Sequence, residues 1–215
     1  MPAQSTSDAA QSTYQVATFS DDHERPITTA DPVIRQAIER LARAYPATLS
    51  LDELTAFPGG EPHNIPAEVE ARVRRAIFTM VLAGRANISV LPLRVGRADH
   101  EHPTAWHLAR TEASSGQPWI TSLRHAGVPA HPILKILLPY LDGAHDRSAL
   151  RARLTDALQR GVASVPELAA DQPPLSEEGF GAVVEQYVEQ TLRHLARHAL
   201  LEPDKANDDL PVDKL

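Results

Sequence analysis

The sequence has 215 residues, a formal net charge of −7, a hydrophobic content of 42% and no cysteine. The negative charge argues against a general affinity for nucleic acid or for an anionic membrane. The absence of cysteine excludes disulfides, thiolate nucleophiles and thiolate metal sites. The N-terminus has neither a basic start nor an apolar signal core, and no run reaches the about 18 apolar residues of a membrane helix, so we expect a cytoplasmic protein without membrane contact.

The first half of the chain alternates helix signals with loop signals. Residues 1–13 are rich in Ser, Thr, Gln and Ala without periodicity, which predicts a disordered lead, and residues 14–19 can form a short strand. Asp31-Pro32 is a cap residue followed by a first-turn proline, which marks the start of a helix. Pro92 lies in the last apolar run and indicates an edge strand or a bulge there. The expected elements are helices over residues 32–45, 50–57 and 66–84 and a strand over residues 88–95.

The second half contains the longest apolar run of the chain, over residues 133–141. Because this run is apolar on nearly all sides, it predicts a helix that is buried on most of its surface. Pro139 should break this helix near its end, Gly143 should take a positive φ, and Asp146 or Ser148 should cap the helix that follows. The expected elements are a strand over residues 119–123, helices over 133–141, 148–160 and 176–198, and a short strand over 199–202.

The order helix, short helix, longer helix, strand is that of a winged helix-turn-helix, and it recurs in the second half. The fold class that we expect is therefore mainly α with short β elements (α+β), arranged as tandem winged-helix-like units. The expected boundaries are a first unit over residues 14–98, a connector with one short helix over 99–118, a second unit over 119–203 and a flexible acidic tail over 204–215.

Several segments resemble the C-terminal part of bacterial S-adenosylmethionine (SAM)-dependent methyltransferases that carry a methyltransferase regulatory domain. The best-known members are the protein lysine methyltransferases that act on rickettsial outer-membrane protein. The two most specific segments are Leu-Arg-His at 123–125 and Leu-Asp-Gly-x-x-Asp-Arg at 141–147, and the similarity extends over about residues 18–201. This resemblance implies a winged-helix domain.

The same resemblance implies a division of labour in which this region does not carry out the chemistry. In that family SAM binds to a separate α/β domain that precedes this region, whereas only the expected disordered lead precedes it here. The sole G-x-G, at 179–181, lies at a predicted helix start and does not follow a strand. We therefore expect no catalytic residue, no cofactor and no methyl transfer. The resemblance implies a regulatory or substrate-recognition module that binds a protein, such as a methyltransferase catalytic subunit or its substrate.

Charged residues in the two specific segments are the candidate interaction site. One alternative is that Arg124 and His125 form an exposed pair that binds a partner's carboxylate. The other is that Arg124 bridges to Asp142 or Asp146 and that His125 bonds to the backbone, as charges at the ends of elements usually do. Arg147 lies off the apolar stripe of its helix and is expected to face solvent. The candidate residues are Arg124, His125, Asp142, Asp146 and Arg147.

A basic run offers a second functional hypothesis, a winged-helix DNA-binding protein. In such a fold the third helix and the wing contact DNA, and the run falls on a predicted third helix and near the following strand. The acidic net charge and the apolar Phe78 and Leu82 on that helix argue against this hypothesis. The residues concerned are Arg72, Arg74, Arg75, Arg94 and Arg97.

Two groups of histidines are candidate metal ligands. His100, Glu101, His102 and His107 lack the spacing of a known closed site, and His194 and His198 lack the glutamate of a zinc-protease helix. The expectation is therefore that the chain holds no metal.

Overall fold

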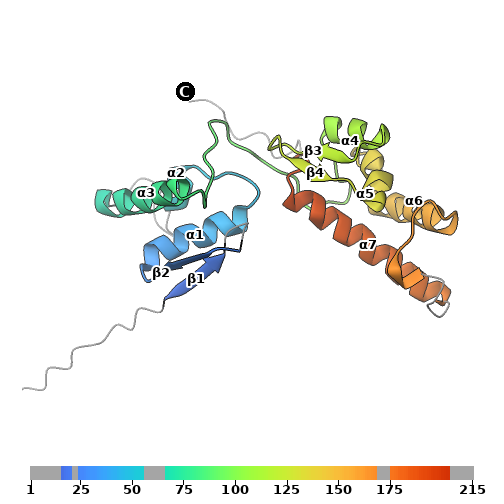
Figure 1. The fold of residues 1–215 in the computed structure, drawn as a ribbon, viewed down its shortest axis with the longest axis horizontal. Helices are drawn as coiled ribbons and strands as arrows, with labels where there is room; N and C mark the ends of the chain where they lie inside the picture. The colour runs from blue at the N-terminus through green and yellow to red at the C-terminus, as the bar shows by residue number, and fades with distance from the viewer. Residues whose placement is uncertain (1–15, 21–23, 56–65, 169–174, 204–215) are drawn as a thin grey trace, which may run out of the picture. The chain divides into compact units, whose positions relative to one another are not determined.

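The computed structural model describes residues 16–20, 24–55, 66–168 and 175–203. It divides into two compact units, one comprising residues 1–44 and 49–90 and the other residues 45–48 and 91–215 (Figure 1). The expected disordered lead at 1–13 and acidic tail at 204–215 lie outside the described residues. Helices dominate both units and the strands are short, so the expected class, mainly α with short β, is confirmed. Over the described ranges, no helix is both long and apolar enough to cross a membrane.

The first unit is a β-hairpin followed by three helices. Its strands β1 (Ala17–Ser20) and β2 (Pro26–Thr29) pair antiparallel, and the helices are α1 (Pro32–Ala44), α2 (Leu51–Thr55) and α3 (Ala67–Leu82). Asp31 caps α1 as expected, because its Oδ1 accepts a hydrogen bond of 2.9 Å from the backbone N–H of Val33. A small core forms between the three helices. It consists of Ala37, Ile38, Leu54 and Val73.

The strand expected over residues 88–95 is wrong. These residues form no strand, and Val90 in the middle of the run is 98% exposed. Two hydrogen bonds join the run to Thr48: the Thr48 N–H donates to the carbonyl of Leu93 at 3.0 Å, and the Leu93 N–H donates to Oγ1 of Thr48 at 2.7 Å. An apolar β-branched run becomes a strand only where a neighbour offers a ladder of partners, and none of the described residues does so here.

The second unit contains a short hairpin and four α-helices packed on one core. The elements are α4 (His107–Ser114), β3 (Trp119–Thr121), β4 (Gly127–Pro129), α5 (Pro132–Leu137), the 3₁₀ turn η1 (Leu138–Tyr140), α6 (Arg147–Gln159), the 3₁₀ turn η2 (Pro166–Leu168) and α7 (Glu177–Arg197). Leucines from α5, α6 and α7 fill the core, and α6 and α7 lie side by side (Figure 1). Fully buried members include Leu134, Leu150, Leu154, Leu192 and Leu195.

Residues after α7 close this unit. Leu201 forms a bridge with Ala105, and its carbonyl accepts a hydrogen bond of 2.9 Å from the N–H of Gly96. The N–H of Glu202 donates to the carbonyl of Thr104 at 2.8 Å. The chain after α7 therefore runs between two earlier segments of the same unit, in place of the short strand expected over 199–202.

The junction between α5 and α6 matches the sequence expectations closely. The α-helix ends at Leu137, and Pro139 lies in the 3₁₀ turn that follows. Gly143 has φ +80°, and a Cβ there would lie 2.7 Å from Oγ1 of Thr104. Asp146 caps α6 by accepting a hydrogen bond of 2.7 Å from the N–H of Ala149. Local residue chemistry alone determines this junction.

Residues 99–118 are not a connector in the structure. They lie within the second unit, which begins at residue 91, and α4 packs into its core. Ala105, Ala109 and Ala113 recur at every fourth position and are almost completely buried. Small side chains at this spacing let the α4 backbone approach the core closely, and a search for large apolar residues overlooks them.

Candidate functional site

The Leu-Arg-His segment forms the tight turn between β3 and β4. Ser122 is buried beneath it, and its Oγ accepts hydrogen bonds from the N–H groups of Arg124 (3.3 Å) and Ala126 (3.2 Å). His125 has φ +55°, and its ring meets the Trp106 ring edge-on at 5.9 Å between centroids. The Ser122 hydroxyl thus satisfies two N–H groups of this turn, as polar side chains commonly do in turns.

Arg124 does not bridge to either aspartate of the second segment. Its guanidinium instead lies over the ring of Tyr45, with 5.5 Å between Cζ and the ring centroid. Tyr45 belongs to the same unit as Arg124. The expected ion pair with Asp142 or Asp146 is therefore wrong. A cation–π contact with a residue distant in sequence takes its place.

Asp142 organises the loop that leads into α6. Its Oδ1 accepts hydrogen bonds from the N–H groups of Ala144 (2.9 Å) and His145 (3.1 Å) and lies 3.0 Å from Nδ1 of His145. Burial alone would raise the pKa of Asp142, but the hydrogen bonds from the His145 side chain and from these two N–H groups outweigh it and lower the pKa to about 2. The carboxylate therefore stays ionised at any physiological pH.

Arg147 is largely buried, contrary to the expectation that it faces solvent. Its guanidinium donates to the carbonyl of Ala98 at 3.0 Å and pairs with the carboxylate of Glu189 on α7. Their side chains are only 15% and 26% exposed. Arg147 thus ties the start of α6 both to α7 and to the segment that precedes α4.

The basic run is divided between the two units, with Arg72, Arg74 and Arg75 on α3 of the first and Arg94 and Arg97 in the second. Three of the five arginines have acidic partners: Arg72 lies 3.2 Å from Asp31, Arg74 pairs with Glu70, and Arg97 pairs with Asp99. The hydrogen bond from Arg97 is the main reason that the pKa of Asp99 falls to about 2. These pairs neutralise much of the positive field that would attract a phosphate backbone.

No group of three His, Asp or Glu side chains within the described ranges is arranged to hold a metal ion. The rings of His194 and His198 lie 4.3 Å apart, and those of His131 and His194 lie 5.8 Å apart. Burial is the main cause that lowers the pKa of His194, to about 4, and the neighbouring His198, His131 and Arg197 lower it further. His194 is therefore neutral near pH 7, and burial lowers the pKa of His131 as well.

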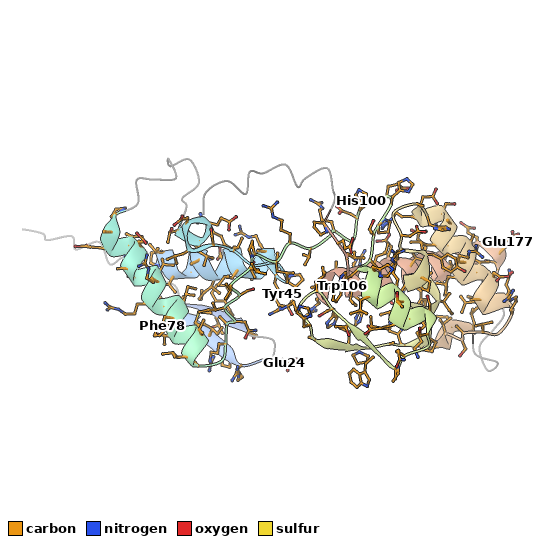
Figure 2. The ribbon with its side chains drawn as sticks, turned by 90° about the horizontal axis from the view of Figure 1, so that it is seen from above. Glu24, Tyr45, Phe78, His100, Trp106 and Glu177 are labelled. Atoms are coloured by element: carbon orange, nitrogen blue, oxygen red, sulfur yellow. The ribbon has the colours of Figure 1, made fainter. Side chains whose placement is uncertain are left out.

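Two surface hollows were missed by the sequence interpretation. One lies on the outer face of α3 and is lined in part by Phe78, which is 57% exposed and is labelled in Figure 2. Leu82, one turn further along α3, is 73% exposed. Because Phe78, Val81 and Leu82 lie off the core-facing stripe, the sequence predicts that the last turns of α3 are buried more widely, and that prediction is wrong. The sequence does carry a signal for this surface, because apolar residues that lie off the core-facing stripe of a helix are exposed to water unless another surface packs against them. The other hollow lies on the outer face of α4.

Comparison with known proteins supports the resemblance. Residues 101–200 match the family model described as PKMT, C-terminal winged helix domain. No curated protein matches the chain. The fold is similar to that of PKMT2 from Rickettsia typhi, with a TM-score of 0.66 and 14% identity over 88% of this chain and 41% of that chain. For PKMT2 in complex with AdoHcy, the TM-score is 0.68 and the identity 16% over 81% and 35% of the two chains.

The chain spans less than half the length of the PKMT2 chains that it resembles. At this level of identity the likeness to PKMT2 concerns the fold alone. The sequence match adds a similarity to that family over residues 101–200, within which Leu123–His125 and Leu141–Arg147 lie. The predicted resemblance to the C-terminal winged-helix region of protein lysine methyltransferases is therefore confirmed, by sequence over residues 101–200 and by fold over most of the chain.

Proposed function

We propose that this chain is a non-catalytic module that binds a protein partner and either regulates a methyltransferase or recognises its substrate. The match to a PKMT C-terminal domain supports a methyltransferase-associated domain. The observation that carries partner binding is the uncovered outer face of α3. Monomeric proteins rarely leave large apolar side chains exposed together unless that surface binds something.

Apolar residues recur along the outer face of α3 from its first turn to its last. Ala67, Ala71, Phe78 and Leu82 fall within one stripe at about 100° per residue, on the side opposite the buried Val73. The stripe is roughly 22 Å long at the usual rise per residue. The hollow covers the part of this stripe between Ala67 and Phe78, where Arg74 and Arg75 flank Phe78. These dimensions suit an amphipathic helix of a partner that lays its apolar face along α3.

The charges beside this stripe indicate the chemistry of the partner. Arg74 already pairs with Glu70, whereas the exposed side chain of Arg75 has no hydrogen-bond or ion-pair partner within the part of the chain that the structure describes. A partner segment with apolar residues flanked by an acid would cover Phe78 and Leu82 and neutralise Arg75.

Site-specific crosslinking tests this function. A photoreactive phenylalanine analogue replaces Phe78 in the host cell, and the crosslinked protein is identified, purified and titrated against the chain. We expect a methyltransferase or its substrate, and Phe78→Ser should weaken its binding at least tenfold, since a central aromatic anchor contributes about 1.4 kcal/mol or more. Val162→Ser is the matched control, because Val162 is similarly exposed on the second unit. Micromolar SAM binding by calorimetry would contradict a non-catalytic role.

DNA binding is the alternative, and we expect it to be weak. Because most of the basic run is paired with acids, random duplex DNA should bind no tighter than about 10⁻⁶ M at physiological salt. Fluorescence anisotropy with a labelled duplex over a salt series measures this. Tighter binding with a steep salt dependence, lost in the Arg72→Gln and Arg75→Gln double variant, would favour the DNA-binding hypothesis.

A further inference from the structure

The second hollow lies on the outer face of α4 and has an unusual lining. It encloses about 340 Å³ and is lined by His107, Arg110, Thr111, Ser114 and Ser115, with Pro139 of η1 at its edge. The four residues of α4 and its C-cap residue, Ser115, recur at helical spacing and therefore share one face. This face carries two basic side chains and three hydroxyls but no carboxylate.

Arg110 is the unexplained group in this hollow. Its side chain is half-buried, and its Nε is buried without a hydrogen-bond partner. Its guanidinium makes no ion pair with any residue that the structure describes. Arg147, which is also largely buried in the same unit, has both a carboxylate and a carbonyl as partners. Burying an unpaired polar or charged group is costly. The described residues offer no partner to Nε of Arg110, so a ligand that pairs with it would be stabilised.

The one acid on α4 is directed elsewhere. Glu112 accepts hydrogen bonds from the N–H (2.6 Å) and the Oγ1 (2.8 Å) of Thr121, so its carboxylate is held against β3. At the far end of α4, the ammonium of Lys135 donates to the carbonyl of Gly116 at 3.1 Å, next to Ser115. The electrostatic environment of the hollow is therefore positive, although the chain as a whole is acidic.

The hydroxyls are placed to take part in binding. Those of Thr111, Ser114 and Ser115 donate to the backbone carbonyls four residues earlier, at 2.8–3.0 Å. Hydroxyl hydrogens rotate freely, and the backbone carbonyls keep their helical hydrogen bonds, so each hydroxyl can turn to donate to a bound oxyanion instead. A guanidinium with several hydroxyl donors around it suits a tetrahedral anion with several oxygens better than a planar carboxylate.

We propose that the α4 hollow is a binding site for a phosphate group, with Arg110 as its principal ligand and His107, Thr111 and Ser115 as supporting donors. The phosphate belongs either to a small phosphomonoester or to a phosphorylated side chain of a partner. The site belongs to the second unit and the α3 face to the first, so this proposal goes beyond the proposed function.

Phosphate titration of the full chain, followed by NMR of the backbone amides and the Arg Nε–H groups, tests the proposal. Inorganic phosphate should cause saturable shifts at residues 107–116 and at Nε–H of Arg110 with a Kd of about 1–10 mM, as expected for a single-arginine site. Sulfate should bind similarly and acetate at equal ionic strength at least tenfold more weakly. Comparison of O-phosphoserine with a phosphoserine peptide then distinguishes the two sources.

Two variants and one control decide the role of Arg110. Arg110→Gln should weaken phosphate binding at least tenfold, and Arg110→Lys, which keeps the charge and the fold, should weaken it several-fold by losing the planar fork. Arg153→Gln is the control, because Arg153 is an exposed arginine stacked on Tyr140 in the same unit, and this substitution should leave phosphate binding unchanged. Shifts that do not saturate below about 50 mM, or equal binding by wild type and Arg110→Lys and Arg110→Gln, would overturn the proposal.

Discussion

Gly96→Ala is expected to lower the free energy of unfolding of the second unit by about 3 kcal/mol, through overpacking against backbone. A Cβ at residue 96 would overlap the carbonyl oxygen of Glu202 and lie 2.9 Å from Cβ of Leu201 and 3.0 Å from the carbonyl carbon of Glu202. Backbone atoms cannot swing aside as the end of a side chain can. The hydrogen bond from the N–H of Gly96 to Leu201 would be forced apart.

Denaturant unfolding followed by tryptophan fluorescence measures this loss. Both tryptophans of the chain, Trp106 and Trp119, lie in the second unit, so the signal reports on that unit alone. Gly181→Ala is the matched control, because a Cβ there meets nothing within 4 Å and the position is in the exposed part of α7. Alanine should stabilise that helix by about 0.5–1 kcal/mol. A Gly96→Ala protein as stable as wild type would contradict the close packing of residues 96 and 201–202.

Arg147→Ala is expected to cost the second unit about 2 kcal/mol, because it removes the better buried of the two guanidinium partners of Glu189 and leaves Arg193, at 3.7 Å, as the remaining one. The loss is smaller than for a fully buried pair, since both side chains retain some contact with water. It also removes the hydrogen bond to the carbonyl of Ala98, which attaches the segment before α4. The same fluorescence transition measures the change.

A double-mutant cycle separates the charge pair from packing. Glu189→Gln and the double variant Arg147→Ala with Glu189→Gln complete the cycle, and the loss in the double variant should be smaller than the sum of the two single losses. Arg124→Ala is the control, since it removes an equally large cation that stacks on Tyr45 and should cost less than about 1 kcal/mol. A loss for Arg147→Ala no greater than for Arg124→Ala would show that the pair with Glu189 contributes no more than a surface contact.

Features determined by neighbouring residues could be predicted from the sequence. The caps at Asp31 and Asp146, the break at Pro139 and the positive φ of Gly143 each depend on the chemistry of one residue and its immediate context. The helices of both units follow for the same reason, from local apolar periodicity.

Features that depend on distant partners could not be predicted in this way. The run at 88–95 has the composition of a strand but no strand beside it, and α4 packs through alanines that carry little apolar signal. The contacts of the candidate interaction residues were the hardest to predict. Arg124 meets Tyr45 and Arg147 meets Glu189, and neither partner is marked by any local pattern. The hollow around Arg110 is visible only once α4 and η1 are placed together.

Residues 200–202 close the second unit through hydrogen bonds to Gly96, Thr104 and Trp106, which emerge from the ribosome long before them. At about 5–20 residues per second, these partners wait several seconds for the residues that complete their pairing. The residues of the first unit, 1–44 and 49–90, are all synthesised before this closure. In that interval the leucine core of the second unit lacks α7, so its apolar side chains stay in contact with water until the last helix is made.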